Sequence, residues 1–211
     1  MRRVALSLAL TVAAACSDIT LPPDHVPAYN YALPATGDVF HWPLNRLPVR
    51  FYADPRGGMR NYVERAVGLW ERQFLYGEFR GVVVADSTAA DVIVLWNGTV
   101  PPDVPPDAGP PVKACGGNTP VVFDATGTAL AGPFHPTLTV LDNTVPPAQI
   151  AACVQRTVVH ELGHSLGLWD HASDSLVIMN VTPWVPVPSD KDRRTVEYLY
   201  HVKPTIAPPP R

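Results

Sequence analysis

The sequence predicts one α+β (mixed α/β) domain with five strands and three helices. Its 211 residues, 46% of them hydrophobic, are enough for one sizeable core. Short runs of β-branched and aromatic residues, typical of strands, are interspersed with segments whose apolar residues recur every three or four positions, as in amphipathic helices. The 25 prolines gather mainly in residues 101–111, 183–188 and 204–210, which indicates loops and a tail rather than a disordered chain.

The first half of the chain predicts three strands around one helix. Residues 48–53 alternate apolar and polar side chains, so we expect a strand. Gly57 and Gly58 then break the chain before a helix at residues 59–79. Residues 81–85 and 91–96 are β-branched runs and are expected to be two further strands. The predicted helix places these apolar residues on one face: Tyr62, Val63, Ala66, Val67, Leu69, Trp70 and Phe74.

The second half predicts two strands and two helices after a long connection. Residues 97–120 are rich in glycine and proline and are expected to be a functional or mobile loop. Strands are expected at residues 121–124 and 137–141. Two prolines precede an expected helix at residues 148–167, and a last helix is expected at residues 190–201.

The N-terminus predicts export. Two arginines are followed by an apolar run, so residues 1–15 form a signal peptide whose apolar part is too short to span a bilayer. The run Ala-Ala-Ala-Cys that ends at Cys16 resembles a bacterial lipoprotein signal, although Ala13 replaces the usual leucine. That resemblance implies lipidation of Cys16, and Ser17 after it implies retention in the outer membrane. The alternative is ordinary cleavage nearby and a soluble secreted protein.

The rest of the chain divides into a tether, a domain and a tail. Residues 16–47 have no hydrophobic period and are expected to be a tether, residues 48–203 the domain, and residues 204–211 a disordered proline-rich tail. The 16 basic and 19 acidic residues give a net charge of −3 without any basic stretch. This composition gives no electrostatic footprint for nucleic-acid binding.

The cysteines agree with an exported protein. Once Cys16 is set aside, Cys115 and Cys153 remain as an even pair, which in an oxidising compartment predicts a disulfide between them. The alternative is a pair of unrelated buried thiols.

The most informative motif is His160-Glu161-Leu162-Gly163-His164. Helical residues four apart lie about 40° apart around the axis and about 6 Å along it, so both histidines can reach one zinc ion. Glu161 follows the first ligand directly, where it can take a proton from metal-bound water without binding the metal. On its own the motif is also compatible with two surface histidines on a helix.

The residues after the motif supply a turn and a further ligand. Gly167 can end the helix and return the chain toward the metal, where His171 or Asp170 would be the third ligand. Met179 follows downstream in the run Ile-Met-Asn. With these features, residues 48–201 resemble the metzincin metallopeptidases and, within them, the matrixin-like branch.

The resemblance implies a fold, a cofactor and an activity. It implies a twisted five-stranded mixed sheet with three helices, in which the active-site helix is followed by a Met-turn at Met179. It also implies one catalytic Zn²⁺ ion on His160 and His164, Glu161 as general base, and hydrolysis of an extended peptide. The substrate would lie along an edge strand near residues 121–124, and residues 180–184 would form a wall of the primed-side pocket.

Two departures from the family pattern bear on the ligands and on latency. Three residues rather than two separate Gly167 from His171, but His171 lies eight residues before Met179, as in matrixin-like sequences. We therefore expect His171 to be the third ligand and keep Asp170 as the alternative. The chain also lacks a recognisable pro-domain, and Cys115 lies inside the catalytic domain rather than in a latency segment.

A structural Ca²⁺ ion, as in matrixins, has little support from the sequence. The candidate carboxylates show no calcium-loop pattern and are expected to be solvated; they are Asp103, Asp107, Asp124 and Asp142.

The sequence thus predicts an exported, lipid-anchored zinc endopeptidase. Its expected partners are a protein or peptide substrate and a membrane reached only through the lipid, and we expect a monomer. Two other functions stay open. One is a catalytically idle metzincin fold that binds a partner and keeps zinc for structure. The other is a lipoprotein adhesin or assembly factor whose histidines scavenge metal.

Overall fold

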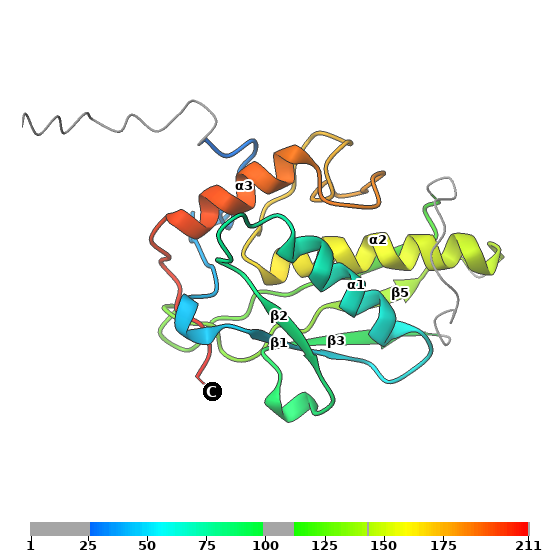
Figure 1. Cartoon of the computed structure of the whole chain (residues 1–211), viewed down its shortest axis with the longest axis horizontal. Helices are drawn as coiled ribbons and strands as arrows, with labels where there is room; N and C mark the ends of the chain where they lie inside the picture. The colour runs from blue at the N-terminus through cyan, green and yellow to red at the C-terminus, as the bar shows by residue number, and fades with distance from the viewer. Residues whose placement is uncertain (1–25, 99–111, 143, 211) are drawn as a thin grey trace, which may run out of the picture.

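A computed structural model describes residues 26–98, 112–142 and 144–210. These residues form a mixed α/β fold with a five-stranded mixed sheet and three helices, as predicted (Figure 1). The strands are β1 (Val49–Ala53), β2 (Gly81–Val84), β3 (Val92–Asn97), β4 (Cys115–Asn118) and β5 (Thr137–Val140). The helices are α1 (Met59–Glu71), α2 (Pro147–Ser165) and α3 (Asp190–His201), with short 3₁₀ turns η1 (Leu44–Arg46) and η2 (Ser87–Ala89).

The sheet has the strand order β2-β1-β3-β5-β4. Strands β2, β1, β3 and β5 are parallel to one another. Strand β4 alone runs antiparallel, with Cys115 opposite Val140 and Asn118 opposite Thr137. Alternate residues of β1 are buried, as the apolar-polar alternation of the sequence predicts. The order leaves β4 at one edge of the sheet.

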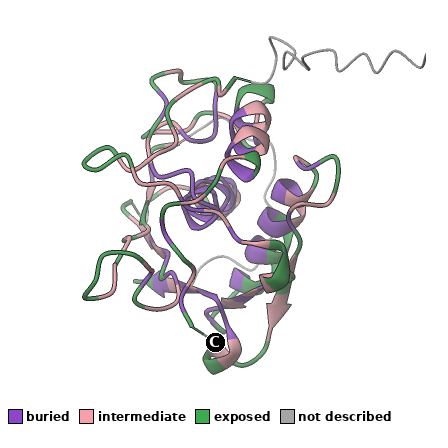
Figure 2. Ribbon diagram, turned by 90° about the vertical axis from the view of Figure 1, so that its left-hand side faces the viewer, coloured by how far each residue is buried: buried purple, intermediate pink, exposed green. Residues whose placement is uncertain are grey.

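Helices α1 and α2 pack against each other over one face of the sheet, with α1 above β1 and β2 and α2 above β4 and β5. Figure 2 looks along α2, the buried coil at the centre of the molecule. Most of α2 is buried because it is surrounded on several sides, and its histidine motif lies inside the protein for the same reason. Helix α3 begins with a capping box in which Ser189 and Asp192 satisfy each other's backbone N–H groups.

Three expectations about the elements are corrected. Strand β4 lies within the expected loop 97–120, whereas residues 121–124 contribute only the isolated bridge from Phe123 to Leu130. Helix α1 ends at Glu71 rather than at residue 79, and Gly77 in the following turn has a φ of 74°. Pairing with β5 gives β4 its extended conformation despite its two glycines, a tertiary effect that overrides local propensity.

The domain also extends beyond residues 48–203. Within the expected tether, Phe40 and Trp42 are fully buried, and Phe40 stacks on Trp169 with ring centroids 5.7 Å apart. Within the expected tail, Ile206 is buried and the Ala207 carbonyl accepts a hydrogen bond of 3.0 Å from the Leu130 N–H. Burying large apolar side chains stabilises the folded state even where they follow no periodic pattern, which is why both ends pack onto the domain.

The predicted signal peptide, residues 1–15, and Cys16 lie outside the described residues. Among the helices that the structure describes, none combines the length and the apolar character that crossing a membrane would require. The predicted disulfide is confirmed: Cys115 of β4 is joined to Cys153 of α2, with 5.9 Å between their Cα atoms. It fixes the edge strand to the central helix.

Candidate metal centre

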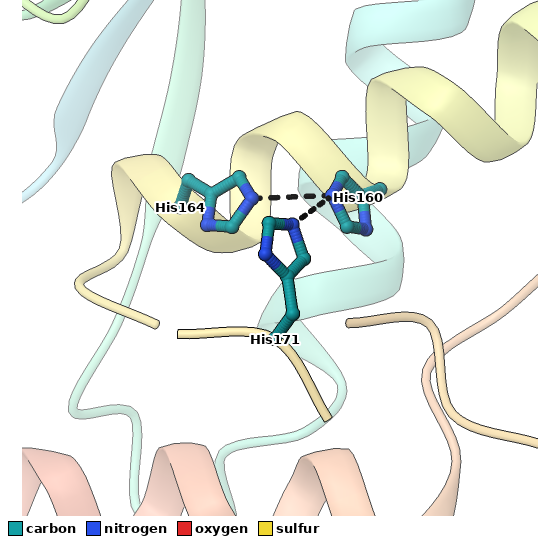
Figure 3. Close-up of side chains that lie close together, drawn as sticks. All are labelled: His160, His164 and His171. Carbon is teal, nitrogen blue, oxygen red and sulfur yellow. Dashed lines mark hydrogen bonds between the residues drawn. The ribbon is translucent and has the colours of Figure 1, made fainter. Parts of the chain in front are cut away.

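Three histidines converge at the C-terminal part of α2 (Figure 3). His160 and His164 project from successive turns of α2, and His171 comes from the loop that follows. The Nε2 atom of His160 lies 3.1 Å from Nε2 of His164 and 3.3 Å from Nε2 of His171. Two nitrogens bound to a tetrahedral zinc ion at about 2.05 Å would be about 3.3 Å apart. The observed spacing therefore suits a shared metal ion.

The protonation of these rings supports the same interpretation. Nδ1 of His160 faces the Ile178 carbonyl at 2.7 Å, and Nδ1 of His164 faces the Leu168 carbonyl at 2.6 Å. A carbonyl only accepts, so each Nδ1 carries the proton and each Nε2 of a neutral ring presents a lone pair. Mainly because they are buried, His160 has its pKa lowered to about 4 and His164 to about 3, so both rings are neutral at pH 7. Lone pairs facing each other repel unless a cation lies between them.

The turn after α2 depends on Gly167, as the sequence predicts. Its φ of 106° is a conformation that residues with a side chain rarely adopt. A Cβ atom there would also collide with the backbone carbonyl of Phe40, in the N-terminal segment. Glycine is therefore required both by the turn and by the segment packed against it.

The structure brings His171, and not Asp170, into the cluster. Both carboxylate oxygens of Asp170 are already engaged: Oδ1 accepts from the His171 N–H at 2.8 Å, and Oδ2 accepts from Asn30 Nδ2 at 2.7 Å. The Trp169 N–H also donates to the Tyr31 carbonyl at 2.8 Å. Asp170 and the N-terminal segment therefore hold the loop that presents His171.

A turn around Met179 lies directly against the histidine-bearing part of α2. Met179 is fully buried, and its sulfur occupies the space into which a Cβ on Gly163 would project. The carboxylate of Asp192, on α3, accepts from the N–H groups of Ile178 at 3.0 Å and of Met179 at 3.4 Å. Because the Ile178 carbonyl in turn accepts from His160, this turn orients the first predicted ligand.

Glu161 lies beside the histidines in a buried position. Its Oε2 accepts a hydrogen bond of 2.6 Å from the Thr119 hydroxyl, and a Cβ on Gly117 would overlap its Oε1. Burial raises the pKa of Glu161 to about 7, an effect that the Thr119 hydrogen bond partly offsets. The carboxyl can therefore exchange a proton near neutral pH.

These groups open onto a cleft of about 650 Å³. Its floor is α2, one wall is β4 with the residues just before and after it, and the other wall is the segment Val181 to Pro183. The sheet edge beside the histidines is thus β4, rather than the strand expected at residues 121–124. Of that expected strand, Val121 lines the cleft.

Of the four candidate carboxylates for calcium, the two that the structure describes, Asp124 and Asp142, do not belong to a cluster of possible metal ligands. Asp124 accepts from Thr126, Thr128 and Ala129, and Asp142 accepts from Thr144, each within its own loop. Asp103 and Asp107 lie outside the described residues. In the part of the chain that the structure describes, the three histidines are the only group able to hold a metal ion.

Sequence reasoning missed several residues that position the site, because none belongs to a recognisable motif. Each acts through a contact between segments distant in the chain. They are Thr119 and Gly117 beside Glu161, Asp192 beside the Met179 turn, Asn30 beside Asp170, and Tyr29, whose hydroxyl donates to Asp192 at 2.8 Å.

A scan against protein-family models and a search of curated proteins find no match to this chain.

Proposed function

We propose that the protein is a zinc-dependent endopeptidase of the metzincin clan, similar to its matrixin-like branch. The observation that carries this proposal is the convergence of three imidazole Nε2 atoms next to the buried carboxyl of Glu161, in a cleft along a sheet edge. The donor set fits zinc, because three neutral histidines are a known ligand set of catalytic zinc sites. His160, His164 and His171 would hold the ion.

Hydrolysis of a peptide bond requires a Lewis acid, which the metal ion would supply, and a base, which the protein supplies. When bound, Zn²⁺ acts as a Lewis acid that lowers the pKa of water and polarises a substrate carbonyl. Glu161 takes the proton of the attacking water on its carboxylate and passes it to the leaving amine. The Thr119 hydrogen bond holds the Glu161 carboxylate in position for both transfers.

Strand β4 offers a place for the substrate backbone. It is the last strand of the sheet in the described residues, so an extended peptide can add to its outer edge through main-chain hydrogen bonds. Gly116 and Gly117 carry no side chains that would keep this peptide from the cleft. The peptide would then run past Glu161 between β4 and residues 181–183.

The open cleft and the intact Glu161 favour this function over a catalytically idle binding protein with a structural zinc. Structural zinc sites are closed by four protein ligands, whereas the described residues offer three here. A purely structural ion would also have no need of a buried carboxyl beside it.

The test is hydrolysis of casein or gelatin by the mature chain with and without a chelator. We expect about one zinc ion per chain, loss of hydrolysis on chelation, and recovery on addition of zinc. In the matched variant Glu161→Gln we expect zinc to stay bound while hydrolysis falls by a factor of 10³ or more, because a base and not a ligand is lost. A zinc-loaded protein that cleaves neither protein nor peptide would favour the idle alternative.

We further propose that the chain is exported and anchored by lipid on Cys16. The support is the sequence of the first 17 residues. Mass spectrometry of the N-terminal peptide from membranes tests this proposal. Diacylglycerol on Cys16 is the expected result, and a mature terminus at another residue would contradict it.

A further inference from the structure

Arg156 is a buried cation for which the described residues supply no acidic partner. Its residue surface is 5% exposed, yet its guanidinium makes one hydrogen bond, of 3.4 Å, from Nη2 to the Val112 carbonyl. Among the residues that the structure describes, no carboxylate forms an ion pair with it. A guanidinium has five N–H donors, and burying a charge is costly unless it is paired. Burial accordingly lowers the pKa of Arg156.

The position of Arg156 connects it with the proposed active site. It lies four residues before His160 on α2, about one helical turn or 6 Å along the axis, and it lines the same cleft. Cys153, three residues earlier on that face, is joined by the disulfide to Cys115 of β4. The guanidinium is therefore held between α2 and the segment that leads into β4.

A second cation lines this end of the cleft. Lys113 is next to Val112 in the chain, and its Nζ lies 5.6 Å from the ring centroid of Trp184, beyond the opposite wall. Glu161 is the one carboxyl among the described cleft-lining residues, and it lies beside the histidines rather than at the Arg156 end. One end of the cleft thus carries two cations, and the other carries the metal-binding and proton-transfer groups.

We propose that Arg156, with Lys113, binds a carboxylate of the peptide substrate and so makes the enzyme selective for a negative charge near the scissile bond. This inference rests on the proposed peptidase function and names its substrate class. The carboxylate supplies the anionic partner that the described residues do not provide, and arginine matches its two oxygens with two parallel N–H groups. One helical turn separates Arg156 from His160, and an extended peptide advances about 3.3 Å per residue. The charge therefore belongs within about two residues of the cut.

The carboxylate can be an aspartate or glutamate side chain or the C-terminus of the substrate, and a peptide set separates these sources. One arm uses internally quenched peptides with both ends blocked, in which Glu or its neutral isostere Gln is placed at each position around the cut. The other arm uses peptides without acidic residues that end, at each distance from the cut, in a free carboxylate or an amide. The enzymes are the zinc-loaded mature wild type, Arg156→Met, Arg156→Lys, Lys113→Met and the control Arg65→Met, which changes an exposed arginine on α1.

In the wild type and in Arg65→Met, we expect one carboxylate position in at least one arm to raise kcat/KM by roughly 10- to 100-fold over its neutral counterpart. Arg156→Met should remove this preference while it still cleaves the neutral peptide, Lys113→Met should reduce the preference, and Arg156→Lys should keep part of it. A wild type that cleaves acidic and neutral peptides equally well would overturn the inference and leave the peptidase function standing.

Binding to a variant that cannot turn over separates the two proposals. Fluorescence anisotropy of labelled acidic and neutral peptides on zinc-loaded Glu161→Gln should show tighter binding of the acidic peptide, and the added change Arg156→Met should abolish the difference. This difference in binding is expected even if the wild type cleaves no peptide. Absence of cleavage would refute the peptidase function but not the binding of a carboxylate by Arg156. Equal binding of the two peptides would overturn the inference. Circular dichroism at 25 °C and thermal unfolding identify any variant that fails to fold, in which case Arg156→Lys and Lys113→Met decide the outcome.

Discussion

At the scale of single residues, the geometry of the site depends on positions without a side chain as much as on the three histidines. Gly117 leaves room for the Glu161 carboxylate, Gly163 for the sulfur of Met179, and Gly167 for the carbonyl of Phe40. The motif predicts Gly167 through its turn, but the other two glycines are explained only by what packs against them. The sequence therefore identifies the groups proposed to carry the chemistry better than the positions that give them space.

Gly117→Ala should impair catalysis more than stability. The new Cβ would overlap Oε1, Cδ and Cγ of Glu161, so the whole Glu161 side chain, but no backbone atom, has to move aside. A displacement of about 1 Å in a catalytic group can cost about 100-fold in rate. We expect kcat/KM on a neutral peptide to fall by roughly 10- to 100-fold, with a melting temperature close to that of the wild type. Gly132→Ala, where a Cβ meets open space, is the control; equal activity of both variants would contradict the role of Gly117.

The third ligand can be assigned by two neighbouring substitutions. His171→Ala should lose most of its zinc and its hydrolysis, because Nε2 of His171 lies 3.3 Å from Nε2 of His160. Asp170→Ala should retain most of its metal, since its oxygens are engaged by Asn30 and by the backbone. Zinc content after dialysis distinguishes the two variants. An empty Asp170→Ala beside a loaded His171→Ala would reverse the assignment.

At the scale of elements, the strands and helices with a clear period could be predicted from the sequence, and those set by distant contacts could not. The alternation in β1 and the three- and four-residue spacing in α1 are local signals, and both elements are found. Strand β4 contains two glycines, so only its pairing with β5 and its disulfide reveal it. Residues 26–47 were missed as part of the domain because their aromatic contacts span more than 100 residues.

The Cys115–Cys153 disulfide should contribute both stability and site geometry. It closes a loop with a sequence separation of 38 residues, for which chain entropy predicts about 2 to 4 kcal/mol. Replacing both cysteines by alanine should lower the free energy of unfolding by that amount and weaken peptide binding, because β4 is no longer fixed to α2. Urea unfolding and KM measure the two effects, and Cys16→Ser is the control. An unchanged KM would show that β4 is held in place without the bond.

The turn between β1 and α1 should make stability depend on pH. The pKa of the buried Asp54 carboxyl is lowered to about 2, below its ordinary value of 3.8, mainly by hydrogen bonds from Arg56. Since the folded-state pKa is the lower one, the stabilisation is complete above pH 4 and is lost as the pH falls toward 2. With allowance for the half-exposed Arg56, Asp54→Asn should cost about 1 kcal/mol at pH 7 and much less at pH 2.5. Urea unfolding at both pH values tests this, and an equal cost at both would contradict it.

At the scale of the whole molecule, the cleft is assembled from parts distant in the sequence. The central helix supplies two histidines and Glu161, the loop after it supplies His171, the sheet edge supplies one wall, and residues 181–183 supply the other. The N-terminal segment and α3 hold these parts from outside through Asn30 and Asp192. The fold thus places the three histidines, the buried carboxyl of Glu161 and two cations along one cleft, which is the path that we propose for a peptide.

The most direct test of the central claim is a zinc titration of the metal-free mature chain, followed by cleavage of one blocked peptide. We predict that hydrolysis rises in proportion to added zinc, levels off at one equivalent, and stays near background in Glu161→Gln at the same zinc occupancy. Hydrolysis that is independent of zinc, or a fully loaded wild type that cleaves no peptide, would contradict the claim that this protein is a zinc peptidase.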